Sequence, residues 1–171
     1  METKINYLSG SFKDRKSAEL AYNRLKEKGY TDKDIDVMMS DATHAKYCKK
    51  NEEEGFGSQV KEGVGAGSAI GGVVGALAGI FAAVGTSIII PGLGLVFAGP
   101  IALGLAGAGA GGVTGGVFGA LIGAGMPKER AVKHENNIKK GDIVVNFTPR
   151  NIEDHASIGN DWTSYHATDV Y

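Results

Sequence analysis

The chain has 171 residues, with 18 basic and 19 acidic side chains and a formal net charge of −1 at pH 7. This length allows one domain with an elaboration or two small domains, and the balanced charge gives no indication of a nucleic-acid partner. The single cysteine, Cys48, excludes an intrachain disulfide and fits a reducing compartment.

Residues 1–41 have the pattern of a strand, a helix and a second strand, and form the first half of the expected domain. Residues 4–12 (KINYLSGSF) predict a short strand, after which Ser11 or Asp14 can cap a helix. Residues 35–39 (IDVMM) begin with alternating apolar and polar side chains and predict the second strand. The helix between these strands has an apolar stripe and a glycine stop, which are Ala18, Ala21, Tyr22, Leu25 and Gly29.

A polar linker over 42–62 leads into an uncharged segment over 63–125, which holds 21 of the 27 glycines. Two glycine ladders in this segment repeat at every fourth residue, so each ladder lies along one face of an α-helix. The ladders are Gly63, Gly67, Gly71, Gly75 and Gly79, and Gly107, Gly111, Gly115, Gly119 and Gly123.

The two ladders match when they are paired antiparallel, which predicts a helical hairpin closed by a glycine zipper. Small residues let two helix backbones pack closely in lipid, where an unpaired backbone group is penalised. A flexible low-complexity linker is the alternative, but the intervening residues are mostly Val, Ile, Leu, Phe and Ala rather than Ser and Thr. The predicted turn of the hairpin contains Pro91, Gly92, Gly94 and Pro100.

The two arms of this hairpin, over 63–88 and 101–125, are candidates for membrane insertion. At about 1.5 Å per helical residue, each arm is long enough for a hydrocarbon core of about 30 Å. A soluble assembly with an apolar core is the alternative, because an exposed apolar hairpin of this size does not remain monomeric in water. The basic residues that flank the segment place the polar parts in the cytoplasm; they are Lys61, Lys128, Arg130 and Lys133.

Residues 126–148 predict a helix that starts at Met126-Pro127 and a strand over 142–147 (DIVVNF). Together with the first half they predict an α+β domain, with a small ferredoxin-like sheet and helices on one of its faces. Residues 149–171 are expected to be a C-terminal tail with at most one short helix. Its aromatic residues are candidates for a membrane interface or a protein contact; they are Trp162, Tyr165 and Tyr171.

No arrangement of residues indicates catalysis. Gly107-x-Gly109-x-x-Gly112 matches a dinucleotide fingerprint in form, but it follows no strand, and such matches are common in a glycine-rich segment. His44 and Cys48 are four residues apart, yet two ligands do not make a zinc site. The sequence therefore predicts a protein that is not an enzyme, with no cofactor, no metal and no small-molecule substrate.

Two stretches of the chain, over 19–41 and 125–145, are similar to the two halves of the bacterial general stress (heat-induced stress) protein family. The first contains ELAY and DIDVMMSD, and the second contains GMPKERA and GDIVV. Members of that family also hold a glycine-rich apolar insertion. The resemblance implies a stress-induced, non-enzymatic cytoplasmic protein that associates with membrane or assembles with itself. The residues after Arg150 depart from the family pattern.

Three hypotheses for function follow from these features. The first is a stress-related structural protein that inserts its hairpin into the cytoplasmic membrane and forms homo-oligomers through the glycine faces. The second is a cytoplasmic particle or shell that assembles around an apolar core and holds lipid or other apolar cargo. The third is an oligomeric pore, although neither arm offers a charged lining.

Overall fold

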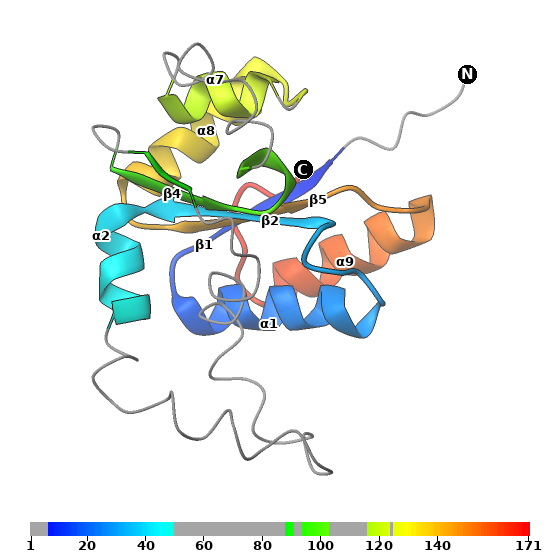
Figure 1. Cartoon of the computed structure of the whole chain (residues 1–171). Coiled ribbons are helices and arrows are strands. Elements are labelled where there is room, and N and C mark those ends of the chain that lie inside the picture. Colours follow the sequence, from blue (N-terminus) through cyan, green and yellow to red (C-terminus); the bar gives the residue numbers. More distant parts are fainter. Residues whose placement is uncertain (1–6, 50–87, 91–93, 103–115, 124) are drawn as a thin grey trace.

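The computed structural model describes residues 7–49, 88–90, 94–102, 116–123 and 125–171. Within these residues, five strands form one antiparallel sheet in the order β1-β5-β2-β4-β3 (Figure 1). The strands are β1 (Leu8–Phe12), β2 (Ile35–Ser40), β3 (Ile88–Ile90), β4 (Leu95–Ala98) and β5 (Ile143–Phe147). The helices are α1 (Arg15–Glu27), α2 (Asp41–His44), α7 (Gly116–Gly123), α8 (Lys128–Lys139) and α9 (Ile152–Ser164), and a π-helical turn, η1, spans Ala45–Lys49. The predicted α+β class is confirmed.

The first helix forms as its local sequence predicts. The side chain of Asp14 accepts a hydrogen bond from the backbone N–H of Ser17 at 2.9 Å and caps α1. Gly29 has a φ of +82°, a conformation that glycine adopts without strain, just after the helix ends. The predicted apolar stripe is buried against the sheet and consists of Ala18, Ala21, Tyr22 and Leu25.

One face of the sheet packs against α1 and α9 (Figure 1). The strand residues that point to this face alternate along each strand, because successive side chains lie on opposite sides of a sheet. They join the helical side chains in one core, whose largest fully buried members are Trp162, Tyr30, Phe12 and Phe147.

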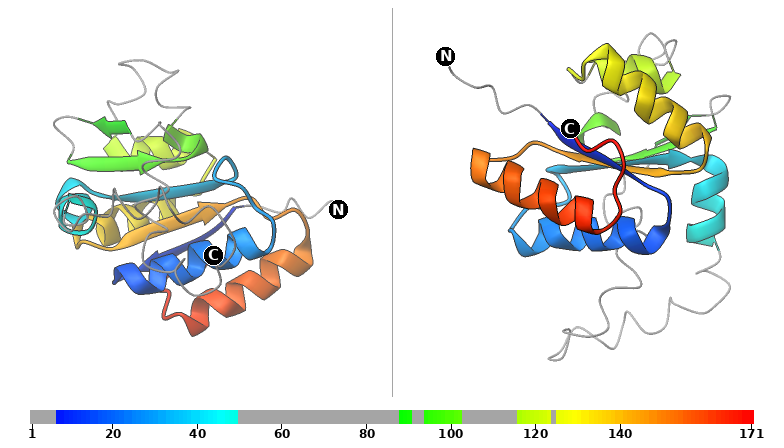
Figure 2. Two further views of the ribbon diagram at one scale, coloured as in Figure 1. Left: turned by 60° about the horizontal axis from the view of Figure 1, so that its bottom comes forward. Right: turned by 180° about the vertical axis from the view of Figure 1, so that it is seen from behind.

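The opposite face packs against α7 and α8, and Figure 2 shows these helices on the other side of the sheet from α1 and α9. This second core includes Met38, Leu95, Phe97, Leu121, Ala131, Ile138 and Val144. The helices therefore cover both faces, and the prediction of helices on one face is wrong. Strands β2 and β5 are buried on both faces, and such strands have near-continuous apolar runs such as VMM and IVV.

The centre of the uncharged segment is part of the sheet. Strand β4 pairs antiparallel with β2 from Val37↔Ala98 to Ser40↔Leu95, and β3 pairs antiparallel with β4. The stretch predicted to turn between two helices instead contains the two strands β3 and β4. This stretch is rich in Ile, Val and Phe, which favour strands as well as membrane helices, so composition alone did not distinguish a strand from a membrane helix.

The expected C-terminal tail is an ordered layer of the domain. Helix α9 starts at the N-cap Asn151, whose side chain accepts from the backbone N–H of Asp154 at 2.7 Å. Trp162 is 0% exposed, and its indole N–H donates to the carbonyl of Ala21 on α1 at 3.3 Å. Trp162 is therefore a core residue and not a membrane-interface aromatic.

Candidate functional site

The predicted helix-packing glycines fall partly within the described structure. Two of the ten, Gly119 and Gly123, lie on α7, one turn apart. The other eight lie outside the described residues, as do Pro91 and Gly92 of the predicted turn and the flanking Lys61. The residues of the formal dinucleotide fingerprint also lie outside the described part of the chain.

Helix α7 separates its apolar side chains from its ladder glycines. Phe118, Leu121 and Ile122 are spaced i, i+3 and i+4, and all three pack in the core beneath α7. A Cβ built on Gly119 or Gly123 meets no described atom within 4 Å. The glycine face of α7 is therefore uncovered by the described part of the domain.

The second half of the predicted turn holds the chain close to strand β2. Gly99 has a φ of +106°, and a Cβ built on it lies 2.2 Å from the carbonyl oxygen of Ile35. Pro100 is exposed and begins a helical stretch, in which the backbone N–H of Ile101 donates to the Asp36 carboxylate at 2.7 Å. Only glycine permits this approach, so Gly99 fixes where the uncharged segment leaves the sheet.

Asp36 is a buried carboxyl beneath that departure point. It is 3% exposed and accepts a second hydrogen bond, from the side-chain amide of Asn146 on the neighbouring strand at 3.1 Å. Burial raises the pKa of Asp36 to about 6, and the two hydrogen bonds oppose that shift. The carbonyl oxygen of the Asn146 side chain is buried without a hydrogen-bond partner among the described atoms.

The flanking basic residues have different surroundings. Lys128 is exposed at the start of α8, whereas Lys133 donates to the Tyr171 hydroxyl and pairs with Asp169 at 3.4 Å. The Arg130 guanidinium lies 5.0 Å from the centre of the Tyr171 ring. Lys133 and Arg130 therefore contact the C-terminal residues. Their position beside the apolar segment in the sequence did not indicate this role.

A buried polar network lies between α8 and β1. His134 is 0% exposed, and its Nε2 and Nδ1 atoms lie 2.8 Å from Ser9 Oγ and 3.0 Å from Ser11 Oγ. Burial lowers the pKa of His134 to about 4. A neutral imidazole has one hydrogen-bond donor and one acceptor, and the two serine hydroxyls can pair with both. Sequence analysis missed this site because the two serines and the histidine are more than 120 residues apart.

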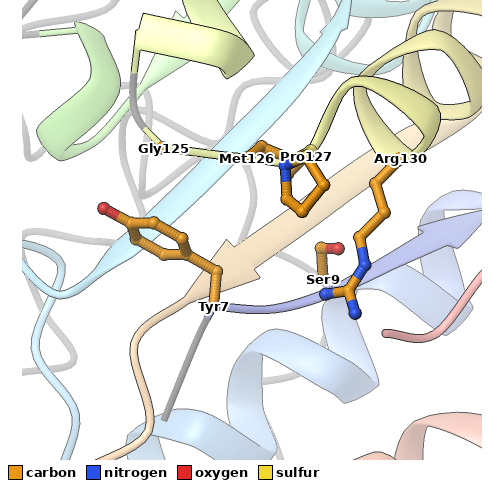
Figure 3. A pocket seen from close by; sticks show the side chains of 6 residues that line it. All are labelled: Tyr7, Ser9, Gly125, Met126, Pro127 and Arg130. Atoms are coloured by element: carbon orange, nitrogen blue, oxygen red, sulfur yellow. The ribbon is translucent and has the colours of Figure 1, made fainter. Parts of the chain in front are cut away.

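A small hollow opens beside this network, between β1 and the start of α8. Figure 3 shows the Arg130 side chain extending from α8 toward Ser9. The free volume of this hollow is about 10 Å³, which is enough for one water molecule and too small for a metabolite. The residues that line it are Tyr7, Ser9, Gly125, Met126, Pro127 and Arg130.

Within the described ranges, no helix combines the length and the apolar character that crossing a membrane requires. Among the same residues, no group of three or more His, Cys, Asp and Glu side chains is arranged to hold a metal ion. Comparison of the chain with protein-family models, with curated proteins and with solved structures gives no match.

Proposed function

We propose that this chain is a non-enzymatic structural protein of the bacterial general stress type, which associates with the cytoplasmic membrane and forms homo-oligomers through its glycine ladders. The observation that supports this most directly is the uncovered glycine face of α7. Glycines one turn apart provide a flat helix surface that a second backbone approaches closely. The small α+β domain is then the polar part of the molecule on the cytoplasmic side.

The partner proposed for this face is the first ladder. In the antiparallel register, Gly119 faces Gly67 and Gly123 faces Gly63, and the other residues of both ladders are uncharged and mostly apolar. The proposed pairing differs from a simple hairpin with a distant tip, because β3 and β4 join the sheet between the two ladders. In chain order, the first ladder lies between η1 and β3, and the second ends in α7 after β4.

The finer fold assignment is also a proposal. Strands β1 and β2 are joined through α1 and flank the antiparallel strand β5. We interpret this unit as a split β-α-β motif of the ferredoxin-like kind. The strands β3 and β4 and the helices α7, α8 and α9 are additions to that motif.

A second candidate is a self-assembling cytoplasmic particle with an apolar core, which holds lipid or other apolar cargo. The position of β3 and β4 favours it, because the middle of the apolar segment belongs to the sheet of the domain. Many copies that pack ladder against ladder would bury the same apolar residues without a bilayer.

Flotation of a detergent-free lysate, followed by an alkaline carbonate wash, distinguishes the two candidates. The membrane proposal predicts that the protein floats with lipid and resists the wash. Dense, lipid-poor particles of discrete size would support the second candidate and contradict the first. Small lipid-free species would contradict both.

A ladder variant tests the packing role of α7. Gly119→Leu adds a bulky side chain to the uncovered face, so we expect the oligomer to dissociate while the domain stays folded. Sedimentation velocity in mild detergent measures the assembly, and far-UV circular dichroism measures the fold. Val132→Leu, at a position on α8 that is 45% exposed, is the matched control. Unchanged assembly in Gly119→Leu, Gly71→Leu and Gly115→Leu would show the zipper proposal to be wrong.

A further inference from the structure

Residues 167–171 run back from the end of α9 along the outer edge of β1 (Figure 2). The backbone groups of Ser9 exchange two hydrogen bonds with Tyr171, both at 3.0 Å. Those of Ser11 exchange two with Thr168, at 2.9 and 2.8 Å. This segment, here named the C-terminal strap, therefore satisfies the donors and acceptors that an edge strand leaves unpaired.

Side chains of α8 hold the strap in place. The side-chain amide of Asn137 donates to Asp169 at 2.9 Å, and Lys133 pairs with the other oxygen of the same carboxylate at 3.4 Å. Asp169 also accepts from the Tyr171 hydroxyl at 2.8 Å. Asp169 therefore anchors the strap through a charged side chain, that of Lys133, and through the neutral side chains of Asn137 and Tyr171.

One residue of the strap has a strained backbone that its contacts offset. Asp169 has a φ angle of +51°, in the left-handed region that non-glycine residues rarely adopt. Its hydrogen bonds to Asn137 and Tyr171 help to hold it there. Loss of those bonds lets Asp169 relax, which favours release of the strap.

His134 lies directly under the strap. Its ring meets the Tyr171 ring edge to face, with 6.1 Å between the ring centres. The strap and the two serines of β1 together keep the imidazole 0% exposed. Release of the strap removes Tyr171 from its contact with the His134 ring.

We propose that the strap is an acid-releasable cover for the edge of β1, which closes over the neutral His134 ring and opens when that ring is protonated. The inference is independent of the glycine ladders and of the proposed function.

The direction of the pH effect follows from the two states of His134. In the closed state burial lowers the pKa of His134 to about 4, whereas a solvated imidazole has a pKa near 6.5. A group whose pKa is lower in the closed state binds protons more readily in the open state, so acid favours opening. The Asp169 carboxylate raises the pKa of His134 and so opposes this effect, but burial outweighs it. The pKa of Asp169 itself is lowered by its hydrogen bond from Asn137, so protonation of Asp169 also favours opening.

The remaining charged groups around His134 do not reverse this direction. Arg130 and Lys133 both lower the pKa of His134 further. Asp142 has a pKa raised by burial, so its protonation favours the closed fold, but it has no hydrogen bond to the strap that is described. Asp36 lies two strands from β1 and bonds to Ile101 and Asn146 instead of the strap.

Hydrogen exchange of the full chain tests the proposal. We expect the protection of the Ser9, Ser11, Thr168 and Tyr171 amides to fall about 20-fold between pH 7 and pH 5, after correction for the intrinsic rate. Amides in α1 and at the centre of β5 should keep their protection over the same range. Equal loss throughout the domain would indicate global unfolding and would overturn the proposal, as would unchanged strap protection.

Two variants assign the effect to the named groups. His134→Gln retains hydrogen bonding to the two serines but does not titrate, so its strap should stay protected at pH 5. Asp169→Asn should open the strap already at pH 7 and provides the test if His134→Gln fails to fold. His155→Gln, on α9 and outside the network, is the matched control and should behave as the unaltered chain. Strap opening at pH 5 in His134→Gln equal to that of the unaltered chain would contradict the proposal.

Discussion

At the scale of single residues, burial decides the chemistry of two polar groups that have ordinary surroundings in the sequence. Asp36 has neighbours in the chain that are apolar, yet its carboxylate is held by a backbone N–H and by a side-chain amide from another strand. His134 lies on a helix with basic neighbours, yet its partners are two hydroxyls of an edge strand. Both pKa values therefore depend on contacts made across the fold.

Asp36 should make stability depend on pH in a defined direction. Its pKa is about 6 in the folded chain against an ordinary value of 3.8, so its ionisation above pH 6 destabilises the fold. The stability that it contributes is present below the ordinary value and is lost as the pH rises through 6. The substitution Asp36→Asn should remove this dependence of stability on pH.

Urea unfolding at a series of pH values measures the Asp36 effect. Between pH 4 and pH 7 we expect the free energy of unfolding of the unaltered chain to fall, relative to that of Asp36→Asn, by up to about 3 kcal/mol. Asp34→Asn, at a half-buried residue of the preceding loop, serves as a control for the loss of one carboxylate. Parallel pH profiles for the unaltered chain and Asp36→Asn would show that the burial of Asp36 has no such consequence.

At the scale of elements, the packing of β1 on α9 depends on a missing side chain. A Cβ built on Gly10 lies 2.9 Å from Cε3 of Trp162, closer than carbon atoms approach in folded proteins. Trp162 in turn meets Phe12 and Phe147 edge to face, with ring centres 5.6 Å apart in both pairs. Gly10 therefore makes room for the largest side chain of this core.

Gly10→Ala should destabilise the domain by about 1–3 kcal/mol, because the added methyl group overpacks the site of Trp162. In urea unfolding, we expect a lower midpoint concentration and an unchanged dependence of the unfolding free energy on urea concentration. Gly159→Ala is the matched control, since its Cβ meets Leu8 at an ordinary 3.9 Å and replaces a glycine inside α9. That control should leave stability unchanged or raise it. Equal midpoints for the two variants would contradict the packing argument.

At the scale of the whole molecule, the last part of the chain completes the fold. Helix α9 covers one face of the sheet, and the C-terminal strap covers the edge of β1. A chain that ends after residue 148 should therefore lose cooperative unfolding, because Phe12 and Phe147 become exposed together with an unpaired edge. Calorimetry of the truncated chain checks this, with Trp162→Phe as a milder change in the same core. A cooperative transition in the truncated chain would show that residues 149–171 are a dispensable tail.

Several elements of this fold are specified by local features of the sequence. Asp14 as a cap, the stripe of α1 and the strand over 142–147 follow from residue preferences and from periodicity, which depend on neighbours a few positions away. The absence of charge over 63–125 is equally a property of the sequence, and the role of the ladders stays a prediction.

Only the tertiary structure decided which surfaces the elements cover. The run of Ile, Leu, Val and Phe near residue 93 fits a strand or a membrane helix, and the choice depends on the free hydrogen-bonding edge that β2 offers to β4. Helix α9 has few apolar residues, and Trp162 becomes a core residue only because Gly10 on β1 leaves space for it. His134 likewise needs β1 and the strap to become buried. Contacts between distant residues depend on the whole chain, so local preferences did not determine them.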